Sequence, residues 1–235
     1  MAQDNPILQN FSNATLSDYT SKLGTKEHWE STYKEDIELF KNNSEECGEI
    51  WFGKQLQKKI VNFIKENFPV KNARILDIGC GNGIFLYKLC KNGYSNLWGI
   101  DYSEASVELA KMIIKQKESK KNRKFTINFF CEDINNTAHI INGKFDIIHD
   151  KGAMDAYLLN KNNTLEKYKA YLKSYSKNGT IFIITSCNNT REELKEKFTE
   201  KEGYSFINEI QNKTFTFGGH SGQQAATQIY KINMV

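Results

Sequence analysis

The sequence predicts a single α/β domain in which a mixed β-sheet carries helices on both faces. Short apolar runs alternate with longer amphipathic stretches from about residue 73 onward, a pattern typical of parallel strands joined by helical crossovers. The 235 residues, of which 39% are hydrophobic and 12% aromatic, suffice for one sizeable core. Near the end of the chain the pattern changes to strand, turn and strand, which predicts an antiparallel pair at one edge.

Five apolar runs are the predicted parallel strands. They lie at 73–79, 96–101, 125–130, 144–150 and 180–186. The antiparallel pair is expected in YSFINEI and AATQIYKI, on either side of the glycine-bearing turn FGGHSG.

The amphipathic stretches between these runs carry helix start and stop signals. Apolar residues recur every four positions over 56–68, and Pro69 ends that helix because the residue before a proline avoids helical geometry. Gly93 stands where a helix commonly ends in a left-handed residue. Ser103 is placed to cap the next helix, and a capping box opens another helix at Thr190.

Charge and cysteine usage exclude several classes of protein. The formal net charge of +4 is too small to predict nucleic-acid binding. Five widely spaced cysteines form no CxxC pair or zinc-like cluster, so no metal is expected and reduced thiols in the cytoplasm are predicted. Residues 1–21 are polar and are expected to be a disordered tail, and no run approaches the 18 apolar residues of a membrane span.

The densest chemical signal is a glycine loop where the first strand turns into its helix. Asp77 is followed by Gly79, Gly81 and Gly83, and glycines there allow a backbone loop to approach a ligand closely. A pyrophosphate cofactor would use GxGxxG and would be repelled by a nearby carboxylate, whereas a cationic sulfonium would be attracted. The loop therefore favours S-adenosylmethionine over a nicotinamide dinucleotide.

Acidic side chains at the next two strand ends support the same ligand. Asp101 ends the second strand, where a carboxylate can accept hydrogen bonds from both ribose hydroxyls. Glu132 and Asp133 follow the third strand and can accept from an adenine amine, with Ile134 beside the ring. The three features in this order at successive strand ends predict a nucleoside site.

The arrangement resembles the seven-stranded class I methyltransferases. Within them the chain is similar to the eukaryotic protein-lysine methyltransferases that modify translation elongation factor 1-alpha. This likeness covers the chain from about residue 22 and is carried by LGTKEHWESTY, GEIWFG, LDIGCGNG, GIDYS, DKGAMDA, ITSCNNTREEL and FTFGGHSG. GEIWFG and FGGHSG are the specific segments, because the whole superfamily shares the glycine loop.

The resemblance implies a Rossmann-like, seven-stranded core at 71–235, a helical lid at 22–70, the cofactor S-adenosylmethionine and a lysine of elongation factor 1-alpha as substrate. It assigns cofactor contacts to Asp77, Gly79, Gly81, Asn82, Gly83, Asp101, Tyr102, Asp133, Ile134 and Asp150, and, as lid residues, to Trp29 and Trp51 with Tyr33. Asp150 would face the methyl group, and Asp150 or Asp155 would orient the incoming amine. The protein is expected to act as a monomer and to bind neither membrane nor nucleic acid.

Several alternatives remain open from the sequence. Asp150 could instead cap the turn that follows its strand, and Lys151 and Gly152 could only shape that loop. The basic run at 111–124 could be a solvated face or a docking patch for an acidic partner. A methyltransferase that acts on a small molecule is a further alternative, because it would have the same cofactor-binding residues. A nucleic-acid methyltransferase is disfavoured because DKGA stands where a proline-containing motif is expected.

Overall fold

The computed structural model describes residues 21–136, 140–211, 214–217, 220–223 and 225–234. Its helices are α1 (Lys26–Asn42), α2 (Gly53–Asn67), α3 (Ile84–Lys91), α4 (Glu104–Lys121), α5 (Ala153–Leu158), α6 (Leu165–Tyr175) and α7 (Arg191–Lys197), with short 3-10 turns η3 (Lys22–Gly24) and η4 (Glu200–Glu202). Its strands are β1 (Arg74–Ile78), β2 (Asn96–Asp101), β3 (Ile127–Cys131), β4 (Phe145–Lys151), β5 (Ser176–Ser186), β6 (Tyr204–Glu209), β7 (Thr214–Phe217), β8 (His220–Gln223) and β9 (Ala226–Ile232).

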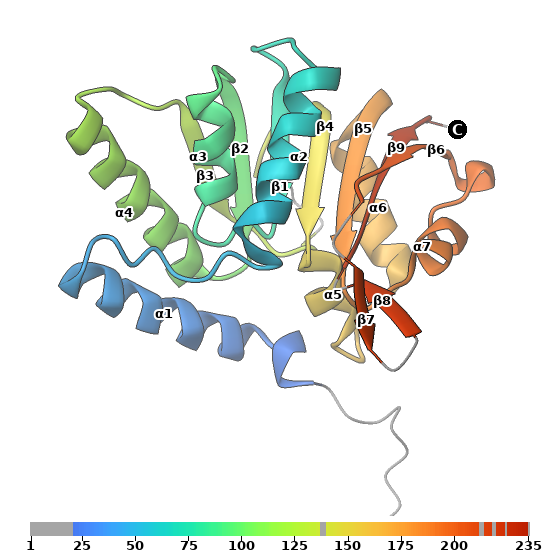
Figure 1. The fold of residues 1–235 in the computed structure, drawn as a ribbon, viewed down its shortest axis with the longest axis horizontal. Helices are drawn as coiled ribbons and strands as arrows, with labels where there is room; N and C mark the ends of the chain where they lie inside the picture. The colour runs from blue at the N-terminus through green and yellow to red at the C-terminus, as the bar shows by residue number, and fades with distance from the viewer. Residues whose placement is uncertain (1–20, 137–139, 212–213, 218–219, 224, 235) are drawn as a thin grey trace, which may run out of the picture.

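One seven-stranded sheet forms the centre of the molecule (Figure 1). Its strand order is β3-β2-β1-β4-β5-β9-β6, and β9 runs antiparallel to both of its neighbours. All five predicted parallel strands are confirmed, and so is the antiparallel pair at the edge. Along the chain, a separate hairpin of β7 and β8 lies between β6 and β9. It was not predicted from the sequence. The predicted turn at 217–222 lies partly outside the described residues.

Each face of the sheet carries its own layer of helices. Adjacent residues of β1 point to opposite faces, so Ile75 packs with α2, α3 and α4 while Leu76 packs with α5, α6 and α7. Strands buried on both faces read as continuous apolar runs, which explains why their sequence does not alternate with polar residues. The sheet is therefore fixed between two layers, and its carboxyl ends are left free for a site.

Local capping agrees with the sequence signals. The Ser103 side chain accepts from the N–H of Ser106, and Thr190 forms the full capping box with Glu193. Helix α2 ends at Asn67, before Pro69, and the buried Tyr94 hydroxyl donates to two carbonyls at that end. The predicted disordered tail falls almost entirely on 1–20, outside the described residues.

Helix α1 passes beneath the carboxyl ends of the strands (Figure 1). Its apolar side chains Ile37 and Phe40 pack against α3 and α4 through Ile84, Leu109 and Ile113. An irregular segment, residues 43–52, then leads from α1 into α2, and we call it the strap. Among the described residues, no helix is long and apolar enough to cross a membrane.

A buried carboxylate after β3 is hydrogen-bonded to helix α6. Glu132, 3% exposed, accepts hydrogen bonds from the hydroxyls of Tyr171 (2.8 Å) and Tyr175 (2.6 Å) on α6 and from the N–H of Ile140. A buried carboxylate is costly unless it is hydrogen-bonded, so these donors are needed for the packing of α6.

Removing one of these donors should destabilise the fold. Tyr175→Phe leaves the ring packing in place but deletes a hydrogen bond to a buried carboxylate, and we expect the free energy of unfolding to fall by about 1–3 kcal/mol. Urea denaturation of the wild type and the variant measures the change.

Tyr204→Phe is the matched control. The buried hydroxyl of Tyr204 has no partner among the described residues, so its removal relieves an unpaired polar group. The variant should be as stable as the wild type or more so. Equal losses of stability in the two variants would show that the hydroxyls contribute only through general packing.

Candidate functional site

The glycine loop between β1 and α3 is shaped by close packing. Gly79, Gly81 and Gly83 all have positive φ, which disfavours other residues. A Cβ at Gly79 would lie 2.5 Å from the Cβ of Ala153, at the start of α5. A Cβ at Gly81 would lie 2.8 Å from the Tyr33 hydroxyl of α1. The glycines thus let both α5 and α1 approach the loop.

Asp101 connects this loop to the end of β2. One carboxylate oxygen accepts the N–H of Gly81 at 3.0 Å, and the other accepts the N–H of Ser103 at 3.0 Å. Burial raises the pKa of Asp101, while these donors oppose the shift. Each carboxylate oxygen still has a second lone pair, so the side chain can also accept from ribose hydroxyls.

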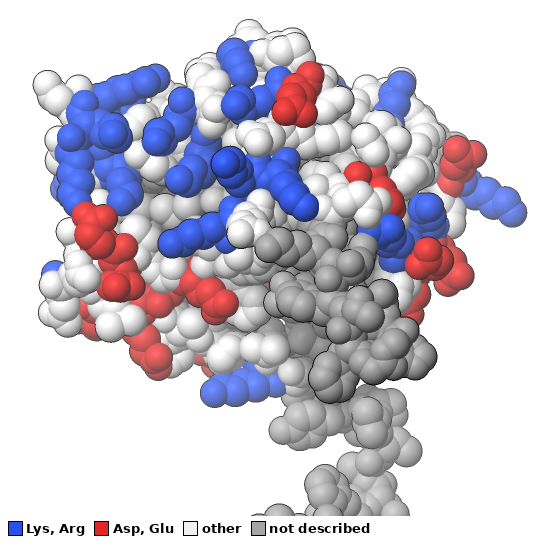
Figure 2. All heavy atoms as spheres, in the orientation of Figure 1, with Lys and Arg blue, Asp and Glu red and all other residues white. Residues whose placement is uncertain are grey.

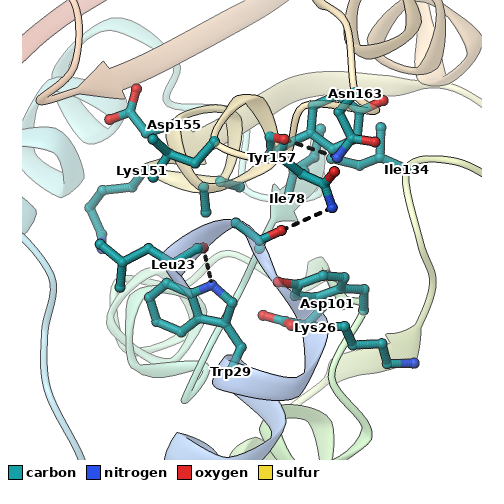
Figure 3. Close-up of a pocket in the computed structure, with 18 of the residues that line it drawn as sticks. Leu23, Lys26, Trp29, Ile78, Asp101, Ile134, Lys151, Asp155, Tyr157 and Asn163 are labelled. Carbon is teal, nitrogen blue, oxygen red and sulfur yellow. Dashed lines mark hydrogen bonds between the residues drawn. The ribbon is translucent and has the colours of Figure 1, made fainter. Parts of the chain in front are cut away.

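A cavity of about 250 Å³ opens over the carboxyl ends of the strands (Figure 3). Strands β1 to β3 and the residues after them contribute Ile78, Gly79, Ile100, Asp101, Tyr102, Glu132, Asp133, Ile134 and Asn135 to its lining. The end of β4 and the residues after it contribute Lys151 to Ala153 and Asp155 to Tyr157, and the segment after β5 contributes Cys187 and Asn188. The remaining lining residues come from the N-terminal segment and from the α5–α6 loop.

The end of β3 provides two acidic groups with different tasks. Glu132 borders the cavity, but its carboxylate is occupied by the tyrosine hydroxyls of α6. Asp133 accepts the N–H of Asn135 with one oxygen, which leaves its second oxygen for an adenine amine. Ile134, beside it, supplies an apolar surface for a ring.

Aromatic residues of the N-terminal segment cover the cavity. The Trp29 ring lies 6.2 Å, between centroids, from the ring of Tyr33, which is also on α1. It lies 5.2 Å from the ring of Trp51 in the strap. The Trp29 indole N–H donates to the carbonyl of Leu23 at 2.8 Å, which fixes the ring over the cavity (Figure 3). Burial and the neighbouring Asp101 carboxylate raise the pKa of the Tyr33 hydroxyl, so it stays neutral.

Asp150 does not line the cavity. Its carboxylate is fully buried and accepts the N–H groups of Ala153 and Met154, each at 3.0 Å, and the hydroxyl of Tyr168 at 2.6 Å. Burial raises its pKa to about 7. The expected contact with the methyl group stays a prediction, and in this structure the Asp150 carboxylate binds the first turn of α5. Asp150 caps α5, which is the alternative that the sequence left open.

Asp155 lies on α5, and it does line the cavity. Its oxygens accept the hydroxyl of Ser186 at 2.5 Å and the N–H of Cys187 at 2.7 Å, both at the end of β5. Asn189 donates to the same carboxylate at 3.4 Å. These bonds hold the side chain at the boundary between α5 and the sheet.

The other predicted cofactor residues divide into two groups. Cavity-lining residues are Trp29, Tyr33, Trp51, Gly79, Asp101, Tyr102, Asp133 and Ile134. Behind the cavity wall lie Asp77, Gly81, Asn82 and Gly83. Asp77 is hydrogen-bonded at 2.7 Å to Nδ1 of His149 on the adjacent strand, and His149 stacks on Phe85.

Sequence reasoning missed the cavity residues that come from outside the strand ends. Asn160, in the α5–α6 loop, donates to the carbonyl of Gly24, and Asn163 donates to the carbonyl of Tyr157 (Figure 3). Both asparagines line the cavity. No motif marks them, since their position depends on how η3 and α5 meet. Lys151 was considered only as a loop residue, yet its side chain borders the cavity.

The basic run lies on α4 and the loop after it, away from the cavity. Figure 2 shows lysine and arginine gathered at this side of the molecule, with acidic residues along the neighbouring surface of α1. Two members of the run are paired, Lys120 with Glu45 and Lys124 with Glu118. Within the described residues, no group of His, Cys, Asp and Glu side chains could hold a metal ion.

The residues that line the cavity fit a nucleoside carrying a positively charged group. Carboxylates stand at the ends of β2 and β3 for ribose and adenine, and Gly79 allows close approach at the end of β1. Sequence comparison agrees, because residues 69–233 match the family described as a methyltransferase domain.

Relatives with named activities match nearly the whole chain. EEF1A lysine methyltransferase 2 of Homo sapiens is 40% identical over 214 residues, which cover 90% of this chain and 87% of the relative. Protein-lysine N-methyltransferase EFM4 of Saccharomyces cerevisiae is 35% identical over 215 residues, with coverage of 86% and 91%.

Solved structures share the fold at low identity. A TehB-like SAM-dependent methyltransferase from Corynebacterium glutamicum has a TM-score of 0.59 at 16% identity and covers 86% of this chain and 99% of its own. Magnesium protoporphyrin IX methyltransferase from Synechocystis PCC 6803, solved with bound SAM, has a TM-score of 0.57 at 14% identity, with coverage of 86% and 84%. The chain belongs to the class I S-adenosylmethionine-dependent methyltransferases, in the family of EEF1A lysine methyltransferase 2 and EFM4.

Proposed function

We propose that this chain methylates the side-chain amine of a lysine in translation elongation factor 1-alpha, with S-adenosylmethionine as methyl donor. The observation that carries the proposal is the match, over 86–91% of the chain, to five protein-lysine methyltransferases from vertebrates and yeasts. Three of these are named for EEF1A. The aromatic cover over the strand ends is consistent with an enzyme that admits one long side chain.

S-adenosylmethionine, when bound, supplies a methyl group already activated by its sulfonium. The protein must therefore position an acceptor amine in line and present it without its proton. A free lysine has a pKa of about 10.4, so the neutral amine costs about 4.6 kcal/mol at pH 7. Excluding water favours the neutral form, and the indoles of Trp29 and Trp51 provide that exclusion.

Asp155 is the proposed orienting group for the acceptor amine. It is the acidic residue that lines the cavity beyond β4, on the side away from the proposed ribose and adenine contacts. Asp150 is proposed to act through α5, because its carboxylate holds the first turn of that helix. Gly79 is proposed to accommodate the methionine end, Asp101 and Tyr102 the ribose, and Asp133 and Ile134 the adenine.

The proposal also covers the location, the oligomeric state and the domain organisation of the enzyme. We place the enzyme in the cytoplasm, where elongation factor acts, and we propose that it acts as a monomer. Residues 22–70 are proposed to form a lid over a core that starts at about residue 71. A methyltransferase acting on a small molecule is the alternative that the experiment below separates.

The wild-type protein should label elongation factor 1-alpha. Purified protein, radiolabelled S-adenosylmethionine and purified elongation factor should give label that mass spectrometry maps to a lysine. Asp101→Ala should abolish labelling and weaken cofactor binding by at least about tenfold, because Asp101 also organises the glycine loop. Calorimetric titration with S-adenosylmethionine measures the binding.

Asp146→Ala is the matched control. Asp146 also accepts a backbone N–H, from Arg74 at 2.7 Å, but at the amino end of β4. This variant should bind the cofactor as the wild type does. Label that appears only in the low-mass fraction of a cell extract, with none on the elongation factor, would contradict the protein substrate and favour the small-molecule alternative.

Asp155 and Asp150 should differ in what their substitution changes. Asp155→Asn should lower kcat by about 10²-fold with cofactor affinity unchanged, since the acceptor loses its orienting carboxylate. It should also lose some thermal stability, because its amide has one acceptor oxygen for the Ser186 and Cys187 donors, so kcat is compared at a temperature where both proteins are folded. Asp150→Asn should lower thermal stability and activity together, because an amide cannot accept both helix N–H groups and the tyrosine hydroxyl. Wild-type kcat in Asp155→Asn would rule out the orienting role.

A further inference from the structure

The strap is held on the core by side chains from distant elements. Gln116 of α4 donates to the carbonyl of Ser44 at 2.9 Å. Asn82 of the glycine loop donates to the carbonyls of Cys47 and Glu49, at 2.8 and 3.0 Å. These contacts fix the first part of the strap, up to residue 49.

Lys151 makes the corresponding contact at the other end. It is the last residue of β4, and its Nζ donates to the carbonyl of Trp51 at 3.2 Å. The same ammonium lies 5.7 Å from the ring centroid of Phe52, within the range of a cation–π contact. Gly152 adds to the contact, because a Cβ there would lie 3.0 Å from the Phe52 ring.

The backbone at this contact is strained. Phe52 has φ of 60°, in the left-handed region that bulky residues rarely adopt, and Gly53 follows with φ of 82°. Such a conformation is unfavourable and persists only where the surroundings impose it. The Lys151 contact and the Phe52 packing act together with the backbone hydrogen bond from the N–H of Gly53 to the carbonyl of Ile50, at 2.8 Å.

The strained turn sets the position of Trp51. Its indole lies against Trp29 and lines the cavity, and its carbonyl accepts from Lys151 at the end of β4. Trp51 is 37% exposed, so little packing outside this contact holds it. If the strap moved, the aromatic cover over the acceptor end of the cavity would open.

Among the described residues, the strap carbonyl is the hydrogen-bond acceptor of the Lys151 ammonium. Burial lowers the pKa of Lys151, and the carboxylates of Asp77, Asp150 and Glu49 oppose that shift. Two cations repel each other, and nearby carboxylates and a bond that directs the ammonium toward the strap reduce this cost.

We propose that Lys151 is a positioning residue, which latches the strap so that Trp51 covers the acceptor end of the cavity. The expected effect on turnover rests on the proposed function. The expected effect on the mobility of the strap does not. Lys151 thereby acts on protein-substrate turnover through Trp51, without contacting the reacting atoms.

The test uses Lys151→Met, Lys151→Arg, Trp51→Ala and the double variant Lys151→Met/Trp51→Ala. Lys151→Met should lower kcat/KM for elongation factor by at least about tenfold with unchanged affinity for S-adenosylmethionine. Lys151→Arg keeps a donor and a cation and should recover most of the loss. In the Trp51→Ala background, Lys151→Met should have no further effect, because the residue that it positions is already gone.

Hydrogen exchange gives a readout that does not depend on turnover. Backbone amides of 47–53 should exchange faster in Lys151→Met than in the wild type, while those of β1 and β4 should not change. Lys195→Met is the matched control, since Lys195 also lies over a phenylalanine ring, that of Phe206, remote from the cavity. It should change neither exchange in 47–53 nor kcat/KM.

Two results would overturn the latch. Unchanged exchange over 47–53 in Lys151→Met would show that Lys151 does not hold the strap. A full additive loss in the double variant would show that Lys151 acts independently of Trp51. If the wild type fails to methylate elongation factor, the proposed function fails, and the exchange experiment alone then decides whether the latch exists.

Discussion

The side-chain amide of Asn82 joins the two parts from which the site is built. Its oxygen accepts the N–H of Ile84 at the start of α3, and its nitrogen holds two carbonyls of the strap. One residue therefore fixes the glycine loop of the core and the segment that covers it. Because Asn82 satisfies these groups while itself nearly buried, the loop and the strap cannot shift independently without leaving polar groups unpaired.

The strand-end carboxylates look equivalent in the sequence but have different partners in the fold. Asp77 is bound to His149, Glu132 to two tyrosines, and Asp150 to the first turn of α5. These three groups stabilise the frame of the cavity. Asp101 and Asp155 also accept backbone N–H groups, yet they border the cavity and can accept from a ligand. At the carboxyl ends of the strands, some acids thus hold helices and others border the cavity, where we propose that Asp101 contacts the cofactor and Asp155 the acceptor amine.

This division explains what the sequence could predict. The parallel strands, the helix caps at Ser103 and Thr190 and the glycine loop depend on neighbours a few residues away, so local patterns reveal them. Whether Glu132 faces a ligand depends on tyrosines about forty residues later in the chain, and no local pattern carries that information. The same holds for Asp150, whose position at a strand end fits either a cap or a ligand contact. The contact of Lys151 with the strap could not be predicted, because its partner, Trp51, lies a hundred residues earlier.

The arrangement around Asp155 addresses a conflict in lysine methylation. A carboxylate attracts the acceptor, but it also stabilises the ammonium that must lose its proton. The Asp155 oxygens already accept from Ser186, Cys187 and Asn189, and these donors offset part of its charge. In the proposed mechanism, a carboxylate held in this way would align the amine. The aromatic cover from Trp29 and Trp51 would favour the neutral amine by excluding water, so the proposal assigns orientation and deprotonation to different parts of the cavity.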